Sequence, residues 1–335
     1  MNNKKPLVSI ACITFNQELY IRECIESFLM QKTSFPIEII IHDDASTDNT
    51  AIILKEYTDK YPELIVPIFQ TVNQYSKGIN PGFEFVFPKC SGKYIAVCEG
   101  DDCWTDPLKL QKQVDFLEEN DGYGLVITDA DFYFQETGII QPAIFQNGLS
   151  FIDTAYPIKS SGYMANMTWL FRKELLQYVD FYTGCTDGAL LLYFELAQHS
   201  KVHFLPIVTG RYRISEGTAS RPIGKIKQYQ YHKDLFDLQK YFIERYKINK
   251  EIADPVLLNT ALTLLPKALA FKDDAFIEEA KSLFERNQLN TKLLIDLFND
   301  YIQFEKELIG IKASKAYRLG KFILKPFSFF KNKFK

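Results

Sequence analysis

The first half of the chain alternates between strand-like and helix-like patterns. Short apolar runs of strand length occupy residues 7–14, 37–42, 65–70, 94–98 and 125–128. Between them, apolar residues recur at helical spacing, first after a capping residue, Asn16, and later from Pro107 onward. Such alternation predicts an α/β fold with a mainly parallel sheet and helices on both faces.

The character of the sequence changes near residue 225, where proline and glycine thin out and helical periodicity takes over. We therefore predict three parts: an α/β domain over 1–224, a helical extension over 225–310 and a basic amphipathic tail over 311–335. No acidic residue follows Glu307, whereas lysine and phenylalanine are frequent there. A cationic, aromatic segment too short to span a bilayer favours peripheral contact with a membrane surface. A basic disordered end, or a helix packed on its own domain, is the alternative.

Composition narrows the class of protein. The chain has 335 residues, 47% of them hydrophobic and 24% charged, as in ordinary soluble proteins. Its net charge of -3 argues against a general nucleic-acid binder. The six cysteines form no C-x-x-C pair, and the polar start does not resemble a signal peptide. A reducing, cytoplasmic location is the expectation, with the inner face of the cell membrane as the surface that the tail would contact.

Three polar clusters follow predicted strands at the point where each strand ends. They are Thr14-Phe15-Asn16, Asp43-Asp44 and Glu99-Gly100-Asp101-Asp102. In parallel α/β sheets, ligands bind beyond the carboxyl ends of the strands, so these clusters are expected to converge on one crevice.

The third cluster places three carboxylates within four residues. Carboxylates that close repel one another unless a cation lies among them, and oxygen ligands favour Mg²⁺ or Mn²⁺. A surface turn is the alternative, since Gly and Asp are common turn residues. With a metal, such a crevice binds a diphosphate instead of repelling it, which predicts group transfer from a nucleotide-diphosphate donor. Neither G-x-G-x-x-G nor a P-loop motif is present on these turns.

Taken in order, these motifs resemble the family-2 glycosyltransferases, which are inverting enzymes that use nucleotide sugars. The resemblance rests on Thr14-Phe15-Asn16, the segment from Ile40 to Thr50, Gly92-Lys93-Tyr94-Ile95 and Glu99-Gly100-Asp101-Asp102, and it covers roughly residues 7–220. It implies the GT-A fold, a Rossmann-like mixed sheet flanked by helices, here followed by an α-helical C-terminal extension.

The resemblance also implies roles for the donor site. Asp44 is expected to contact the nucleotide base, with Thr14, Phe15 and Asn16 lining that pocket. Glu99 stands where the family has the first Asp of its D-x-D motif and is expected to reach the ribose. Asp101 and Asp102 are the expected ligands of Mn²⁺ or Mg²⁺ and, through it, of the diphosphate.

The acceptor side is implied by later motifs. Asp187 precedes a helix as the family's general base does, although a simple helix N-cap also fits its position. Lys77, Trp104 and Arg213 are candidate contacts of the diphosphate or the acceptor. The alternatives are core packing for Trp104 and a structural salt bridge for Arg213. Ser215 replaces a histidine that completes the metal site in many relatives.

The resulting expectation is an inverting, metal-dependent hexosyl- or hexosaminyltransferase. It would move a sugar from a UDP-sugar to a glycan or lipid-linked acceptor in surface polysaccharide or lipopolysaccharide biosynthesis. Two alternatives remain open: a nucleotidyltransferase, although the turn after residue 12 lacks the glycine and lysine that a triphosphate loop needs, and a non-catalytic sugar-nucleotide-binding protein.

Overall fold

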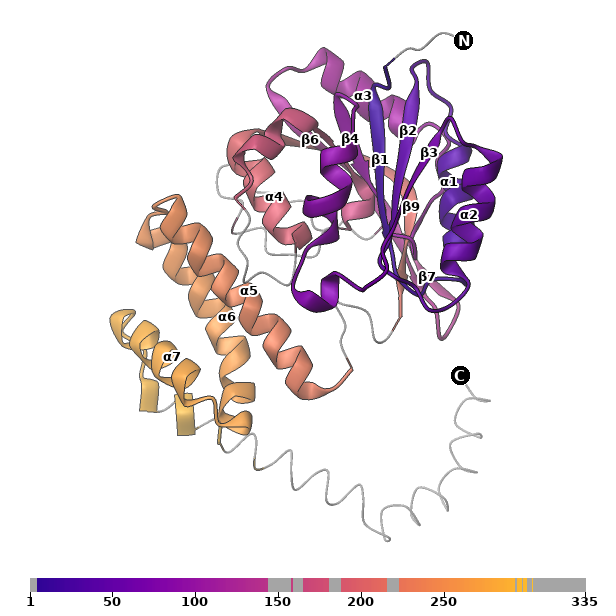
Figure 1. Cartoon of the computed structure of the whole chain (residues 1–335). Coiled ribbons are helices and arrows are strands. Elements are labelled where there is room, and N and C mark those ends of the chain that lie inside the picture. Colours follow the sequence, from indigo (N-terminus) through magenta and orange to yellow (C-terminus); the bar gives the residue numbers. More distant parts are fainter. Residues whose placement is uncertain are drawn as a thin grey trace, which may run out of the picture. The chain divides into compact units, whose positions relative to one another are not determined.

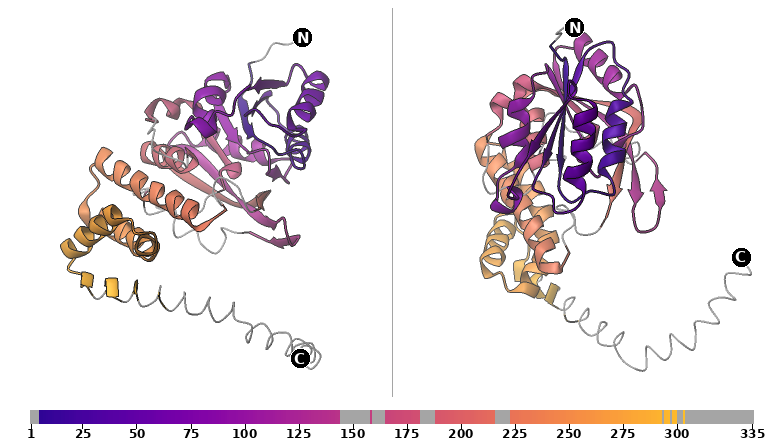
Figure 2. Two further views of the ribbon diagram at one scale, coloured as in Figure 1. Left: turned by 60° about the horizontal axis from the view of Figure 1, so that its bottom comes forward. Right: turned by 45° about the vertical axis from the view of Figure 1, so that its right-hand side comes forward.

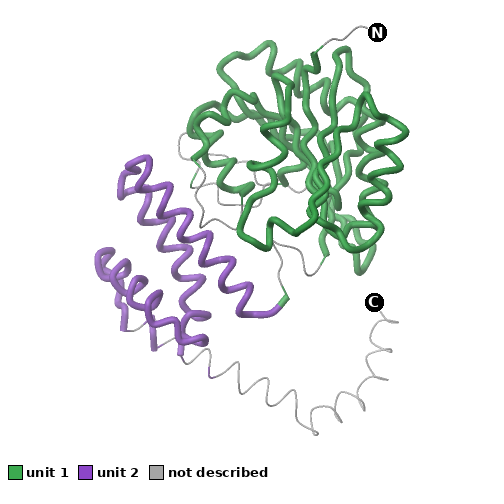
Figure 3. Tube along the Cα trace, viewed as in Figure 1, with its two compact units in different colours: residues 1–223 green, residues 224–335 purple. Residues whose placement is uncertain are grey.

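The computed structural model describes residues 5–143, 158, 165–180, 188–215, 223–292, 294–296, 298–299 and 303. The chain divides into two compact units, Met1–Ile223 and Gly224–Lys335 (Figure 3). Each unit has its own hydrophobic core.

The first unit is built on one mixed sheet (Figure 1) with the strand order β3-β2-β1-β4-β8-β6-β9-β5 and with β7 paired to β6. The strands are β1 Val8–Thr14, β2 Ile37–Asp43, β3 Ile65–Phe69, β4 Tyr94–Val97, β5 Cys103–Trp104, β6 Tyr123–Phe134, β7 Ile139–Gln141, β8 Trp169–Arg172 and β9 Lys201–Ile214. Strands β1 to β4 run parallel, β8 is antiparallel to both β4 and β6, and β9 is parallel to β6. The sheet is therefore mixed, as the GT-A resemblance implies, and the hairpin of β6 and β7 projects from it (Figure 2).

Three helices cover one face of the parallel half of the sheet: α1 Ile21–Leu29, α2 Thr50–Lys60 and α3 Lys109–Glu119. Their apolar stripes meet alternate residues of β1, β2 and β4 in a continuous core. Helix α4, Gly188–His199, lies on the other side of the sheet (Figure 1).

Two helices begin later than their capping signals predict. Asn16 has φ of 51°, and its Oδ1 accepts a hydrogen bond from Thr47 N at 2.8 Å, so this side chain braces a loop and helix α1 begins at Ile21. The Asp106 carboxylate accepts from Leu108 N at 2.9 Å in a local turn, and helix α3 begins at Lys109, beyond Pro107.

Two buried polar side chains, Lys109 and Gln113, join α3 to the centre of the sheet by hydrogen bonds. The Lys109 side chain is fully buried, its Nζ donates to Gln113 Oε1 at 2.7 Å, and it lies 4.4 Å from the centre of the Trp104 ring. Gln113 Nε2 in turn donates to the carbonyl oxygens of Val126 and Thr168 at 3.1 and 2.8 Å. Burial lowers the pKa of Lys109 to about 7.

The second unit contains α5 Lys225–Arg245, α6 Lys250–Phe271 and α7 Asp274–Arg286. The side chains of Asn249 and Asp273 cap α6 and α7, and Lys233 Nζ pairs with Asp273 at 2.6 Å. In the part of the chain that the structure describes, no helix has the length and apolar character needed to cross a bilayer. The predicted tail over 311–335 lies outside the described residues.

We predict that Lys109 makes stability depend on pH. Between its folded pKa of about 7 and the ordinary 10.5, the unfolded chain binds a proton that the folded chain does not, so stability rises with pH across that range. In urea unfolding, the free energy of unfolding of the natural chain should gain about 1.4 kcal/mol per pH unit between pH 7 and 10 relative to Lys109→Met. A difference between the two proteins that does not change with pH would contradict the neutral, buried lysine.

Candidate functional site

The carboxyl ends of β1, β2 and β4 bring the three predicted clusters together. Asp44 N donates to Thr14 O at 3.0 Å, which joins the ends of β2 and β1. Gly100 N donates to Ile13 O at 3.0 Å, which joins the segment after β4 to the same end of β1. Residues from three distant parts of the sequence therefore meet at one edge of the sheet.

The segment after β1 is rigid. Thr14 is buried, and its Oγ1 donates to Gln17 Oε1 at 2.8 Å. Asn16 uses its backbone N to bond Ser46 Oγ at 2.9 Å, in addition to its side-chain bond with Thr47. Phe15 remains 42% exposed, so its ring is available to a ligand.

Asp44 organises the neighbouring loop. Its carboxylate oxygens accept from Gln74 N at 2.8 Å and Tyr75 N at 3.0 Å, which stabilises the short helical turn Tyr75–Lys77. Asp44 is only 1% exposed, so here its side chain supports the loop, and its contact with the nucleotide base stays a prediction. Lys77 lies exposed at the end of this turn.

The acidic residues lie in the segment 98–104, which we call the hairpin although the flanking strands β4 and β5 do not pair with each other. Gly100 allows this segment to approach β1 closely. A Cβ atom at this position would lie 2.5 Å from Gln17 Oε1 and 2.8 Å from Thr14 Oγ1. Any other residue would therefore collide with the pair that fixes the end of β1.

Two carboxylate oxygens of this hairpin are buried without a hydrogen-bond partner, Asp101 Oδ1 and Asp102 Oδ2. Burial raises the pKa of Asp101, and burial together with the charge of Asp101 raises the pKa of Asp102 well above its ordinary value. Among the described residues, no group of three or more His, Cys, Asp or Glu side chains is arranged to hold a metal ion. The pair nevertheless fits Mg²⁺ or Mn²⁺, which take one or two carboxylates and fill the remaining positions with phosphate oxygens and water.

Strand β9 clamps the hairpin through Arg213. Its backbone N donates to Asp102 Oδ1 at 2.7 Å, and its Nε donates to Asp101 O at 2.8 Å. Its other nitrogens donate to Gln135 Oε1 at 2.6 Å and Glu23 Oε2 at 2.8 Å. The structure thus shows Arg213 in the structural salt bridge, the second of its two predicted roles.

Trp104 does not line the acceptor site, which corrects its expected role as a contact of the diphosphate or the acceptor. Its side chain is 2% exposed, its Nε1 donates to Met167 O at 2.8 Å, and its ring lies 4.8 Å from that of Phe28. Because a buried ring cannot stack on a sugar, the core-packing alternative describes this residue.

Asn166 is a site residue that the sequence did not reveal. Its Nδ2 donates to Glu99 Oε1 at 2.9 Å, across 67 positions of sequence. The longer side chain of Glu99, compared with the usual Asp, is therefore held at its tip. Nothing near Asn166 in the sequence marks it, since its role depends only on where β8 begins.

Asp187 lies outside the described residues, but its neighbour Gly188 is described and begins α4. A Cβ at Gly188 would lie 1.9 Å from Asn80 Nδ2, and one at Gly82 would lie 3.2 Å from Asn80 Oδ1 and 3.4 Å from Ile13 Cδ1. Asn80 therefore connects the start of α4 with the carboxyl end of β1, where the clusters converge.

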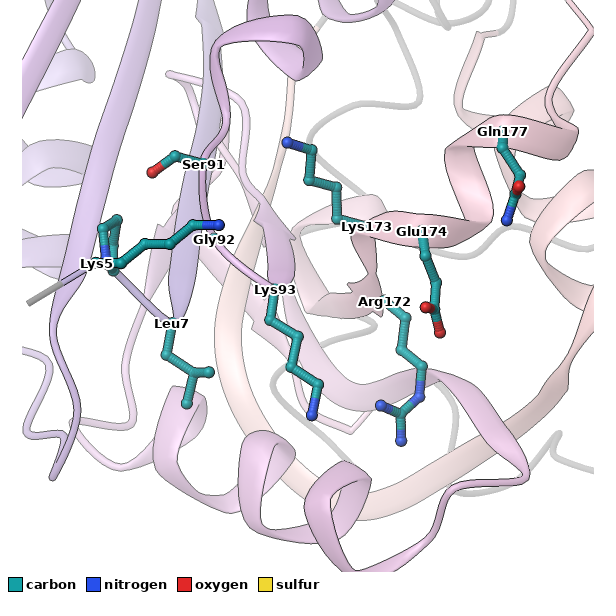
Figure 4. Close-up of a pocket in the computed structure, with 10 residues that line it drawn as sticks. Lys5, Leu7, Ser91, Gly92, Lys93, Arg172, Lys173, Glu174 and Gln177 are labelled. Carbon is teal, nitrogen blue, oxygen red and sulfur yellow. The ribbon is translucent and has the colours of Figure 1, made fainter.

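A separate hollow of about 630 Å³ lies at the opposite, amino-terminal edge of the sheet, beside Leu7, Gly92 and Lys93 (Figure 4). Three of its four cations have protein partners: Lys93 pairs with Glu118 at 2.8 Å, Arg172 donates to the carbonyl oxygens of Leu117 and Tyr123, and Lys173 donates to that of Cys90. This hollow holds none of the clustered carboxylates.

We predict that Asp102 costs stability in the ligand-free protein. A carboxyl pKa raised on folding means that its stabilising contribution is present at low pH and is lost as pH rises through the folded pKa. Asp102→Asn keeps an acceptor for Arg213 N but removes the buried charge. It should increase the free energy of unfolding at pH 7 by about 1.4 kcal/mol per unit of raised pKa, and the gain should vanish toward pH 4.

Urea unfolding of the ligand-free chain checks this. The control is Asp106→Asn, which removes a carboxylate that pairs with Lys112 at 2.6 Å on the surface and should not stabilise the fold. A loss of stability in Asp102→Asn at pH 7 would contradict the buried, repelled carboxylate.

Comparisons with known proteins agree with this geometry. The model of a family described as "Glycosyl transferase family 2" matches residues 9–179. An uncharacterized protein of Mycobacterium tuberculosis is 50% identical over 113 residues, which are 34% of this chain and 32% of that protein. The putative teichuronic acid biosynthesis glycosyltransferase TuaG of Bacillus subtilis is 35% identical over 136 residues, 38% of this chain and 51% of that protein. The matches thus span about a third to a half of these relatives.

Two solved structures resemble the fold. TarS 1-349 of S. aureus, in complex with UDP-GlcNAc, has a TM-score of 0.56 and 18% identity, covering 79% of this chain and 73% of that one. The mannosyltransferase PcManGT of Pyrobaculum calidifontis, in complex with GDP-Man and Mn²⁺, has a TM-score of 0.53 and 16% identity, covering 91% and 89%. At such identities the likeness concerns the fold, and it confirms the predicted GT-A architecture.

Proposed function

Because the chain belongs to glycosyl transferase family 2, we propose that it transfers a sugar from a UDP-sugar to a hydroxyl group of a glycan or lipid-linked acceptor, with inversion at the anomeric carbon. The observation that carries this proposal is the pair of unpartnered buried oxygens, Asp101 Oδ1 and Asp102 Oδ2, at the edge where β1, β2 and β4 end. A nucleotide diphosphate with a divalent cation is the ligand class that such a pair suits.

The donor end of the reaction is assigned to the fixed residues of this edge. Asp44 and Phe15 flank the space for the base, and Glu99, held by Asn166, faces the ribose. Asp101 and Asp102 would hold Mn²⁺ or Mg²⁺, which when bound supplies positive charge that stabilises the leaving diphosphate. Their own contribution is two buried oxygens without a hydrogen-bond partner on a segment that Arg213 and Ile13 hold in place, so that little reorganisation accompanies donor binding.

The acceptor end is assigned to Asp187 as the general base that takes the proton of the attacking hydroxyl. The support is indirect: Gly188 lies against Asn80, Asn80 Oδ1 accepts from Gly82 N at 3.0 Å, and Gly82 lies beside Ile13 of β1. A base on the side opposite the leaving diphosphate is sufficient for inversion in one displacement.

The biological role we propose is assembly of surface polysaccharide, which the likeness to TuaG supports. In this proposal residues 1–224 carry the chemistry and residues 225–310 form an extension. The tail over 311–335 contacts the inner surface of the membrane, where a lipid-linked acceptor is available.

We expect release of nucleoside diphosphate from a panel of UDP-, GDP- and dTDP-sugars to be greatest with one UDP-sugar and to require Mn²⁺ or Mg²⁺. Asp187→Asn should lower turnover by about 10²- to 10⁴-fold while leaving the affinity for Mn²⁺ and UDP unchanged, because a general base acts only in the chemical step. Asp101→Asn should weaken that affinity itself.

Asp106→Asn serves as the control, since this carboxylate pairs with surface Lys112. Turnover that survives chelation of divalent cations would contradict metal binding by Asp101 and Asp102. Full turnover in Asp187→Asn would show that Asp187 is not the general base.

A further inference from the structure

We infer that Arg213 is a positioning residue: its backbone N holds the Asp102 carboxylate, its guanidinium holds the backbone carbonyl oxygen of Asp101, and it does not itself contact the donor. This inference rests on the proposed function and deepens it. It departs from the role of diphosphate contact that the sequence offered for Arg213.

The side chain of Arg213 has no nitrogen left without a protein acceptor. Nε, Nη1 and Nη2 donate to Asp101 O, Gln135 Oε1 and Glu23 Oε2, at 2.8, 2.6 and 2.8 Å. The side chain is 7% exposed. Three of its five N–H groups are bonded in this way, and burial of the side chain covers the guanidinium from a diphosphate.

Two aromatic rings hold the guanidinium in place. Its central carbon lies 4.5 Å from the ring centre of Tyr20 and 5.1 Å from that of Tyr133. A lysine ammonium can also lie near an aromatic ring, but only the planar guanidinium can make the three hydrogen bonds in fixed directions at the same time. The position therefore requires arginine for both its hydrogen bonds and its shape.

Arg213 ties the hairpin to three other elements at once. Glu23 belongs to α1, and Gln135 follows the end of β6, while Arg213 itself lies on β9. Glu23 also accepts from Cys103 Sγ at 3.6 Å, so the same carboxylate supports both sides of the hairpin. Loss of the guanidinium would remove the links from Asp101 O to Glu23 and Gln135 through Arg213, and the bond from Cys103 to Glu23 would remain.

The clamp also has an electrostatic consequence. Its guanidinium carries a fixed positive charge and bonds the carbonyl oxygen of Asp101 at 2.8 Å, next to the two carboxylates. Arg213 thus serves as a permanent counter-charge beside the hairpin without occupying the two free oxygens.

The test measures the affinity of the full chain for UDP in the presence of Mn²⁺, by titration calorimetry, together with urea unfolding of the ligand-free protein. Arg213→Lys and Arg213→Met should weaken the affinity by about 10- to 100-fold, as loss of an outer-shell partner does at metal sites. Glu23→Gln, which leaves Arg213 in place but loosens its fork, should weaken the affinity in the same direction by a smaller factor.

Arg172→Met is the matched control. Arg172 is also buried, and it donates to the carbonyl oxygens of Leu117 and Tyr123 at the opposite edge of the sheet. Its loss should lower stability at least as much as Arg213→Lys does, yet leave the affinity within about twofold of the natural chain, because stability alone does not set this affinity.

Four outcomes are distinguishable. Weaker binding in Arg213→Lys and in Glu23→Gln, with normal binding in Arg172→Met, supports the inference. Normal binding in Arg213→Lys overturns it, and so does weak binding in Arg213→Lys with unchanged binding in Glu23→Gln, which indicates direct contact with the donor. Absence of UDP binding in the natural chain counts against the proposed function instead.

Discussion

The hydrogen bonds from Arg213 to the hairpin after β4 set the conditions for the rest of the site. They hold two buried carboxylates next to each other, an arrangement that costs free energy unless fixed partners offset it. The Asp102 carboxylate accepts a hydrogen bond from the backbone N of Arg213. The backbone carbonyl oxygen of Asp101 accepts one from Arg213 Nε. Asp101 Oδ1 and Asp102 Oδ2 remain without a hydrogen-bond partner, and these are the oxygens that we propose bind the metal. The raised pKa of Asp102 shows that the fold keeps this pair at a cost in stability.

The parallel half of the sheet follows closely from the sequence because each strand is a continuous apolar run between capping or turn residues. The remaining strands carry weaker local signals. Strand β5 has only two residues, and β8 is antiparallel to both of its neighbours, so their placement depends on tertiary contacts. The starts of α1 and α3 differ from the predictions because the side chains of Asn16 and Asp106 bond nearby loops instead of capping a helix.

The site residues likewise divide into those with a local signal in the sequence and those whose place depends on tertiary contacts. The convergence of residues at or just beyond a strand end, such as Thr14, Asp44 and Asp101, could be predicted because parallel topology brings strand ends together. Trp104 could not be placed from sequence, since an aromatic residue beside a polar cluster fits a wall or a core equally well. Asn166 gave no signal at all, because its bond to Glu99 crosses 67 positions. The family model, which matches residues 9–179, covers the clusters but not Asp187 or Arg213.

The most direct test of a prepared site is a crystal structure of the chain with UDP and Mn²⁺, with the metal located by its anomalous scattering, compared with a ligand-free crystal. The account predicts one Mn²⁺ within about 2.0–2.2 Å of a carboxylate oxygen of Asp101 or Asp102. It also predicts that the backbone of residues 98–104 moves by less than about 1 Å and that Arg213 keeps its bonds to the hairpin. A metal bound elsewhere, or a hairpin rebuilt on binding with those bonds broken, would contradict it.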